Sequence, residues 1–248
     1  MTLAFRGRGV RVLPAPFAGA PIAYVIGGFE RAEEIADAWA DPRASLAFID
    51  CPDWNRDLSP WPAPACFRGG EAFSGEADRF LNELLTEIIP GVESFLAARP
   101  VSANSEANPP AAMSTICAQN GDARTNASAA PRAIVGVSLA GLFGVYALFR
   151  TAAFSLCASV SGSLWFDGFS DFMASNDMTA RPARIYLSLG DREERTKNQR
   201  LRPVGEATRA ASARFALLGI ETRFEMNPGN HFADPVPRLI RALDWLYQ

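Results

Sequence analysis

The amino-acid sequence predicts an α/β fold in which helices cover both faces of a mostly parallel sheet. Short apolar runs alternate with helical patterns along the second half of the chain, as in parallel strands joined by crossover helices. Its 248 residues fit one large domain, because α/β folds of about 250 residues often form a single unit. The content of 48% hydrophobic and 21% charged residues is close to the globular average. We therefore expect one domain over residues 1–248.

The first half of the chain carries apolar runs separated by turn signals. The predicted elements there are a strand or hairpin at 3–13, strands at 22–26 and 46–49, a helix at 31–39 and a long loop at 51–70. Apolar residues recur at helical spacing over 75–98, which predicts a long helix. Pro90 lacks a backbone N–H, so we expect it to kink or divide that helix.

Residues 100–131 differ in composition from both flanks. They are rich in Ala, Ser, Asn and Pro and poor in large apolar side chains, which predicts a flexible surface insertion. The alternation resumes after this segment. The predicted elements are strands at 133–136, 158–160, 185–189 and 221–226, and helices at 138–150, 204–218 and 235–247.

Charge and hydropathy exclude several classes of function. Twenty-four basic and 27 acidic residues give a formal charge of −3, so the basic footprint of a nucleic-acid-binding protein is absent. No stretch approaches the roughly 18 apolar residues of a membrane span. Arginines at positions 6, 8 and 11 leave no apolar run between them, which argues against a signal peptide. These observations predict a soluble cytoplasmic protein, with its oligomeric state left open.

The four cysteines have no metal-binding or redox spacing. Cys51, Cys66, Cys117 and Cys157 form no C-x-x-C pair, which excludes zinc ribbons and thioredoxin-like motifs. A core of this size needs no disulfide, so free thiols are expected.

A serine stands at a predicted turn from strand to helix. Residues 136–141 read Gly-Val-Ser-Leu-Ala-Gly, a variant of the nucleophile elbow G-x-S-x-G. Small residues at Gly136 and Ala140 would leave room for a sharp turn that exposes the Ser138 hydroxyl. The amide of Leu139 would then donate to an oxyanion. The alternative is a serine that only caps the following helix.

The only histidine of the chain, His231, follows a predicted strand and precedes the last helix. It could deprotonate Ser138, because an unperturbed imidazole titrates near neutrality. Its loop lies at the carboxyl edge of the sheet, where open α/β sheets place their sites. The alternative is a surface histidine without a role.

An acid that orients the histidine is expected after the predicted strand 185–189. The next residues offer three carboxylates, of which Glu193 is favoured over Glu194 and Asp191. Asp167 and Asp171, after the preceding strand, are weaker candidates. Acidic loops are often merely solvated, so the choice stays open.

The turn after the first buried strand is the expected source of a second oxyanion amide. Gly28 and Phe29 are the candidates, because glycines allow a backbone to approach a ligand closely. Trp54, Trp61 and Trp165 could line an acyl or aromatic pocket, or could simply belong to the core.

Several segments together resemble the esterase family of α/β-hydrolases that contains esterase D and the enterochelin and siderophore esterases. The segments that carry the likeness are 53–64, 87–90, 136–141, 161–165, 187–194 and 229–232. The resemblance implies an α/β-hydrolase fold and a serine esterase with Ser138 as nucleophile, His231 as base and Glu193 as acid. Ala140 departs from the family pattern, in which many members have glycine, and the insertion at 100–131 is unusual.

The sequence therefore predicts a serine carboxylic-ester hydrolase that forms an acyl-enzyme on a small-molecule ester. This chemistry needs no metal and no organic cofactor. A siderophore-type trilactone esterase is a narrower alternative, and acyl transfer to another alcohol would use the same residues. A catalytically silent binding protein with a hydrolase fold is the non-enzymatic alternative.

Overall fold

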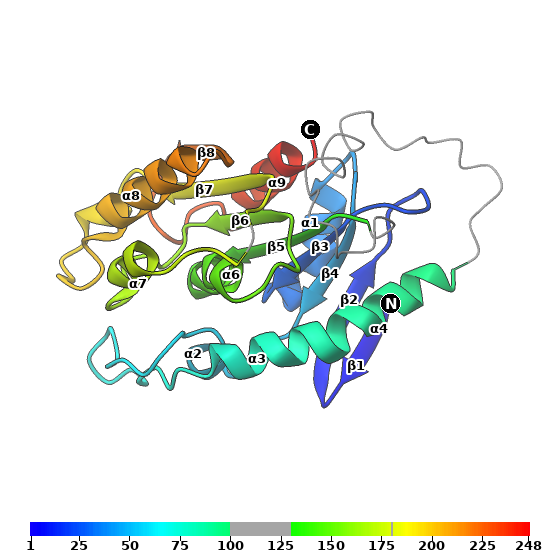
Figure 1. Ribbon diagram of the computed structural model, residues 1–248, viewed down its shortest axis with the longest axis horizontal. Coiled ribbons are helices and arrows are strands. Elements are labelled where there is room, and N and C mark those ends of the chain that lie inside the picture. Colours follow the sequence, from blue (N-terminus) through cyan, green and yellow to red (C-terminus); the bar gives the residue numbers. More distant parts are fainter. Residues whose placement is uncertain (100–129, 180) are drawn as a thin grey trace.

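The computed structural model describes residues 1–99, 130–179 and 181–248. Residues 100–129 of the expected insertion, with Cys117, lie outside the described residues. In the described part, eight strands form one sheet in the order β1-β2-β4-β3-β5-β6-β7-β8 (Figure 1). The strands are β1 (Thr2–Phe5), β2 (Arg8–Leu13), β3 (Ile22–Ile26), β4 (Ser45–Ile49), β5 (Arg132–Val137), β6 (Leu156–Val160), β7 (Arg184–Gly190) and β8 (Glu221–Asn227).

Along this order the sheet is parallel from β4 to β8, whereas β2 pairs antiparallel with both β1 and β4. The predicted α/β class is therefore confirmed, as is the opening hairpin. The carboxyl ends of the parallel strands meet at one edge because the pairing is in register: Gly136 on β5 lies opposite both Ile26 on β3 and Ser159 on β6. Every loop that follows a parallel strand consequently emerges at this edge.

Helices cover both faces of the sheet (Figure 1). The helices are α1 (Ala32–Ala38), α2 (Trp54–Asp57), α3 (Ala77–Glu83), α4 (Ile89–Ala97), α6 (Leu139–Arg150), α7 (Phe169–Ser175), α8 (Val204–Leu217) and α9 (Pro235–Leu246), with 3₁₀ turns η1 (Phe29–Arg31) and η3 (Glu193–Arg195). The core is divided accordingly: β5 turns Ile134 toward the cluster under α3, α4, α6, α7 and α8, and Val135 toward the cluster under α1 and α9. Alternate residues face opposite sides, and both are buried, so the strand reads as one continuous apolar run.

The long helix predicted over 75–98 is divided, as expected. A π-helical segment, η2 (Leu84–Ile88), joins α3 to α4, and Pro90 is the second residue of α4. Proline can donate no i→i−4 hydrogen bond and its ring crowds the preceding turn, which favours a locally widened helix at this point.

Two short helices were not predicted from the sequence. Helix α2 spans only four residues, too few to show a helical period, and α7 spans seven. Strand β6 also begins two residues before the predicted 158. The described cysteines Cys51, Cys66 and Cys157 are free thiols, as expected. Among the described residues, no helix is long and apolar enough to cross a membrane.

Candidate active site

Ser138 stands on a strained turn between β5 and α6. Its backbone has φ 60° and ψ −123°, a conformation that costs a non-glycine residue about 1–3 kcal/mol and is concentrated at functional sites. The neighbours must be small: a Cβ on Gly136 would lie 2.4 Å from the carbonyl carbon of Ala140. The Ser138 side chain makes no capping hydrogen bond to α6, so it does not act as a helix cap. Its hydroxyl is left for another partner.

That partner is His231, in the loop after β8. The imidazole Nε2 lies 3.0 Å from Ser138 Oγ, although the two residues are 93 positions apart. The other ring nitrogen, Nδ1, lies 2.8 Å from Glu193 Oε2. A hydroxyl, an imidazole and a carboxylate thus form one chain of hydrogen bonds at the carboxyl edge of the sheet.

The three neighbouring carboxylates of the loop after β7 have different partners. Glu193 is buried and is the one that contacts His231. Asp191 turns to the loop after β8, where Oδ1 accepts from the Gly229 N–H at 2.9 Å. Glu194 points toward α8 and pairs with Arg209 at 2.9 Å. Of the weaker candidates, Asp167 forms an ion pair with Arg200, and Asp171 is exposed on α7.

The environment of Glu193 favours its ionised form. Burial alone would raise the pKa of this carboxyl group, but three hydrogen bonds outweigh that effect and leave the pKa below its ordinary value. The donors are His231 to Oε2, and to Oε1 the Gly190 N–H at 2.6 Å and the Ser161 hydroxyl at 2.7 Å. A carboxylate is therefore present to accept the imidazole N–H.

The predicted oxyanion amides lie at neighbouring positions of the same edge. Leu139 is the first residue of α6, and Phe29 is the first residue of η1, so neither N–H has a partner within its own helix. Gly28 precedes η1 with φ 67°, in the left-handed region that glycine adopts readily. Ile26 on β3 pairs with Gly136 on β5. Gly28 and Ser138 each follow two residues after this pair, so the two turns leave the sheet at the same height.

The three tryptophans do not form one pocket. Trp54 lies over the β3 turn, where a Cβ on Gly27 would be 2.7 Å from its ring, and 36% of its surface is exposed. Trp61 packs among Phe166, Phe169 and Phe172. Trp165 is half-buried and belongs to the same aromatic layer through Phe73 and Phe166. Trp54 is thus the tryptophan placed beside the turn that carries the predicted oxyanion amides of Gly28 and Phe29.

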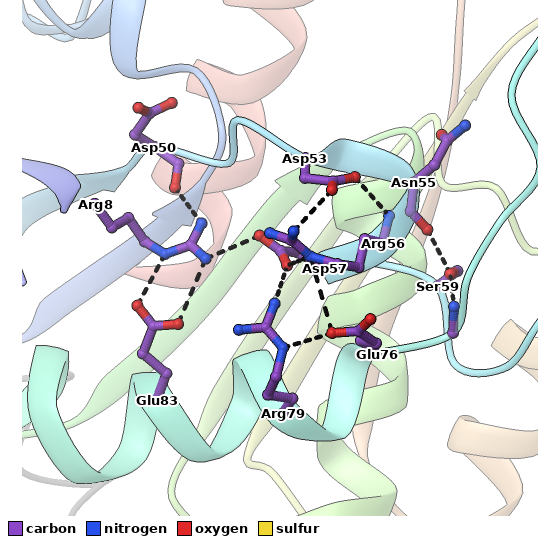
Figure 2. A network of polar contacts seen from close by, with 11 residues as sticks. Arg8, Asp50, Asp53, Asn55, Arg56, Asp57, Ser59, Glu76, Arg79 and Glu83 are labelled. Carbon is purple, nitrogen blue, oxygen red and sulfur yellow. Dashed lines mark hydrogen bonds and ion pairs between the residues drawn. The ribbon is translucent and has the colours of Figure 1, made fainter. Parts of the chain in front are cut away.

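A network of ion pairs around the buried Asp57 holds α2, the helix that begins at Trp54 (Figure 2). Asp57, at the end of α2, has no exposed surface and accepts from Arg8 at 2.8 Å, Arg56 at 2.9 Å and Arg79 at 2.7 Å. Burial alone would lower the pKa of Arg8, but hydrogen bonds to Glu83 and Asp57 outweigh this effect, so the pKa is raised. The network fastens α2 to both β2 and α3.

Three polar residues around Ser138, His231 and Glu193 were not among the site residues predicted from the sequence. Ser161 and Ser163 follow β6; Ser163 Oγ lies 3.4 Å from Ser138 Oγ, and the Ser161 hydroxyl contacts Glu193. Arg238 on α9 is 1% exposed and lies 3.4 Å from Glu193 Oε1. A signal was available for Arg238, because it lies four residues before Ala242 and so falls on the apolar stripe of its helix.

Known proteins that resemble this chain are distant from it in sequence. No family model matches the sequence. The uncharacterised protein YbbA of Bacillus subtilis (strain 168) is 23% identical in an alignment of 212 residues that covers 82% of this chain and 73% of that protein.

Several solved structures are similar. The IroE-like serine hydrolase from Shewanella oneidensis has a TM-score of 0.71 and 18% identity, over 97% of this chain and 75% of that one. The siderophore hydrolase EstB from Aspergillus nidulans has a TM-score of 0.60 and 18% identity, over 100% of this chain and 93% of that one. The enterochelin esterase from Shigella flexneri has a TM-score of 0.65 and 18% identity, over 97% of this chain and 55% of that enzyme. At such low identity the likeness concerns the fold, and the chain has the α/β-hydrolase fold that the sequence predicts.

Proposed function

We propose that this protein is a serine carboxylic-ester hydrolase with Ser138 as nucleophile, His231 as general base and Glu193 as the acid of the triad. The observation that carries the proposal is the chain of two hydrogen bonds, 3.0 Å from Ser138 to His231 and 2.8 Å from His231 to Glu193. The strained backbone of Ser138 supports it, because a serine with a purely structural role has no need of that conformation.

The proposed reaction begins when Ser138 Oγ attacks the ester carbonyl and His231 Nε2 takes its proton. The Glu193 carboxylate accepts the Nδ1–H and stabilises the imidazolium that forms. Amides of Leu139 and of Gly28 or Phe29 would hold the oxyanion. The imidazolium then protonates the leaving alcohol, and water cleaves the acyl-enzyme by the same steps in reverse.

A siderophore-type trilactone is the second candidate substrate class. It is favoured by the likeness to structures described as enterochelin esterase, siderophore hydrolase, and enterobactin and salmochelin hydrolase IroE. Exposed aromatic rings also flank the site: Trp54 lies over the Gly27 turn, and Phe232, 82% exposed, packs edge-to-face on His231. Planar aryl groups of a substrate could stack on such rings.

The decisive experiment is the turnover of p-nitrophenyl acetate by the wild type and by Ser138→Ala and His231→Ala, together with labelling by a fluorophosphonate. We expect both variants to lose turnover and the label to be found on Ser138. Ser163→Ala is the matched control, because its hydroxyl lies 3.4 Å from Ser138 Oγ yet does not contact His231; it should still be labelled on Ser138.

A folded wild type that neither hydrolyses the ester nor takes up the label would contradict the proposal and favour a silent binding protein. If the enzyme is active, enterobactin and simple aryl esters compared at equal concentration separate the two substrate classes. Adding a second alcohol to the assay distinguishes hydrolysis from acyl transfer, which would yield a new ester.

A further inference from the structure

The two oxygens of Glu193 have different surroundings. Oε2 faces His231, whereas Oε1 is surrounded by donors: the Gly190 N–H at 2.6 Å, the Ser161 hydroxyl at 2.7 Å and Arg238 Nη1 at 3.4 Å. A carboxylate oxygen with three donors cannot rotate without losing several hydrogen bonds in a buried site, where unpaired polar groups are costly. This crowding keeps Oε2 directed at the imidazole.

Arg238 joins this crowded oxygen to the loop that carries His231. Nη1 donates to Ser161 Oγ at 3.1 Å, and Ser161 in turn donates to Glu193. Nη2 donates to the carbonyl of Pro228 at 2.7 Å, three residues before His231. One guanidinium therefore bridges the acid and the histidine loop from a position on α9.

The local backbone leaves space for this bridge. A Cβ on Gly190 would lie 3.0 Å from Arg238 Nη2 and 2.4 Å from the carbonyl oxygen of Gly229. The planar fork of arginine suits the role, because its donors stand on separate nitrogens and reach acceptors farther apart than the three donors of one lysine ammonium can.

A contribution to stability alone does not explain why the Arg238 guanidinium is buried. Arg238 is 1% exposed, and its Nε has no hydrogen-bond partner among the described residues. Burying a cation with an unsatisfied donor costs free energy, and well-packed apolar residues often replace buried ion pairs without loss. A function in the site gives a reason for such a residue.

We propose that Arg238 and Ser161 are positioning residues of the proposed esterase: they fix Glu193 so that Oε2 meets His231, and Arg238 ties the histidine loop to the same anchor. The inference rests on the proposed function and adds residues that do not touch the substrate. It predicts that their loss lowers kcat through Glu193 and leaves substrate binding nearly unchanged.

The test compares kcat and KM for p-nitrophenyl acetate in wild type, Arg238→Gln, Arg238→Lys, Ser161→Ala and the double variant Arg238→Gln/Glu193→Gln. We expect R238Q to lower kcat about 10- to 100-fold, the range for one lost charge-assisted hydrogen bond. KM should change by less than about threefold, since the change affects the transition state. The kcat of R238K should lie between those of R238Q and wild type, and S161A should lose less kcat than R238Q.

The double variant separates positioning from general damage. If Arg238 acts through Glu193, the double variant should be no slower than Glu193→Gln alone, because residues that act as a unit are not additive. If the losses in kcat of the two single variants multiply in the double variant, the inference is wrong.

Arg184→Gln is the matched control: this arginine is also largely buried and binds Glu221, but it begins β7, at the sheet edge opposite the triad. Its kcat should equal that of wild type.

A folded R238Q enzyme with kcat within about twofold of wild type would refute the inference. If R238Q does not fold, R238K and S161A decide: wild-type kcat in both would refute it, and a loss confined to kcat would support it. A wild type without turnover or labelling refutes the proposed function itself, and this inference fails with it.

Discussion

The Glu193 carboxylate is expected to contribute about three orders of magnitude to the rate of the proposed hydrolysis, so Glu193→Gln is the most informative single substitution. The change keeps the size of the side chain and removes the charge that would face an imidazolium. It also allows an amide N–H to meet Nδ1, which favours the wrong tautomer of His231.

The magnitude follows from the geometry. Glu193 Oε2 and His231 Nδ1 are 2.8 Å apart, and the two charges would be centred about 4 Å apart. The Glu193 side chain is only 3% exposed, so an effective dielectric constant of about 20 applies, and the attraction is about 4 kcal/mol. That energy corresponds to about a 1,000-fold change in rate, and the wrong tautomer would add to the loss.

The assay is steady-state hydrolysis of p-nitrophenyl acetate, with circular dichroism to establish that each variant is folded. Two neighbouring carboxylates serve as matched controls. Asp191→Asn should lose less than about tenfold, because Asp191 accepts an exposed backbone N–H of the histidine loop and forms a surface pair with Arg192, without contacting His231. Glu194→Gln removes a surface pair with Arg209 and should leave kcat close to wild type.

The reasoning is refuted if folded Glu193→Gln keeps more than about a tenth of the wild-type kcat. It is equally refuted if Asp191→Asn or Glu194→Gln causes the larger loss, since the acid would then be another member of the loop.

Three further predictions concern stability. Asp57→Asn should cost about 3 kcal/mol in urea unfolding, because three arginines lose the buried carboxylate that they bind, whereas the half-exposed Glu76→Gln should cost less than about 1 kcal/mol; equal losses would contradict this. Gly136→Ala should cost about 1–3 kcal/mol in the same assay, since its Cβ would overlap Ala140, and a neutral result would argue against the tight turn. The pKa of Glu193 is lowered on folding, so its carboxylate stabilises the fold above the ordinary value of 4.5 and this contribution is lost below it. The stability difference between wild type and Glu193→Gln should therefore shrink as the pH falls from 7 to 3.5, and a difference that grows would reverse the assigned sign.

Local features of the chain were readable from the sequence. The alternation of apolar runs and helical periods predicted the parallel sheet, and Pro90 predicted the division of the long helix. The Gly136–Gly141 segment predicted a sharp turn at Ser138, because the requirement for small residues acts between atoms only a few positions apart. A single histidine in the chain left one candidate for the base.

Other features could not be read in this way. Asp57 belongs to a polar segment that reads as exposed, yet Arg8 and Arg79 reach it from 49 positions before and 22 positions after in the sequence. Helix α2 is too short for a periodic signal, and tertiary packing holds both it and α7 in place.

The loop of the proposed acid shows most clearly what the sequence and what the tertiary structure determine. The sequence by itself determined the sheet, the strained serine and the loop in which an acid would be found, since these depend on local stereochemistry and on burial. Which carboxylate meets the histidine depended on pairing between chain segments: β7 and β8 run in register to Gly190 and Asn227, and a 3₁₀ turn then directs Glu193 inward and Glu194 outward. Arg238 and Ser161 reach the same carboxylate from 45 and 32 positions away. Contacts at such separations are set by strand register and helix packing, so only the folded chain decides them.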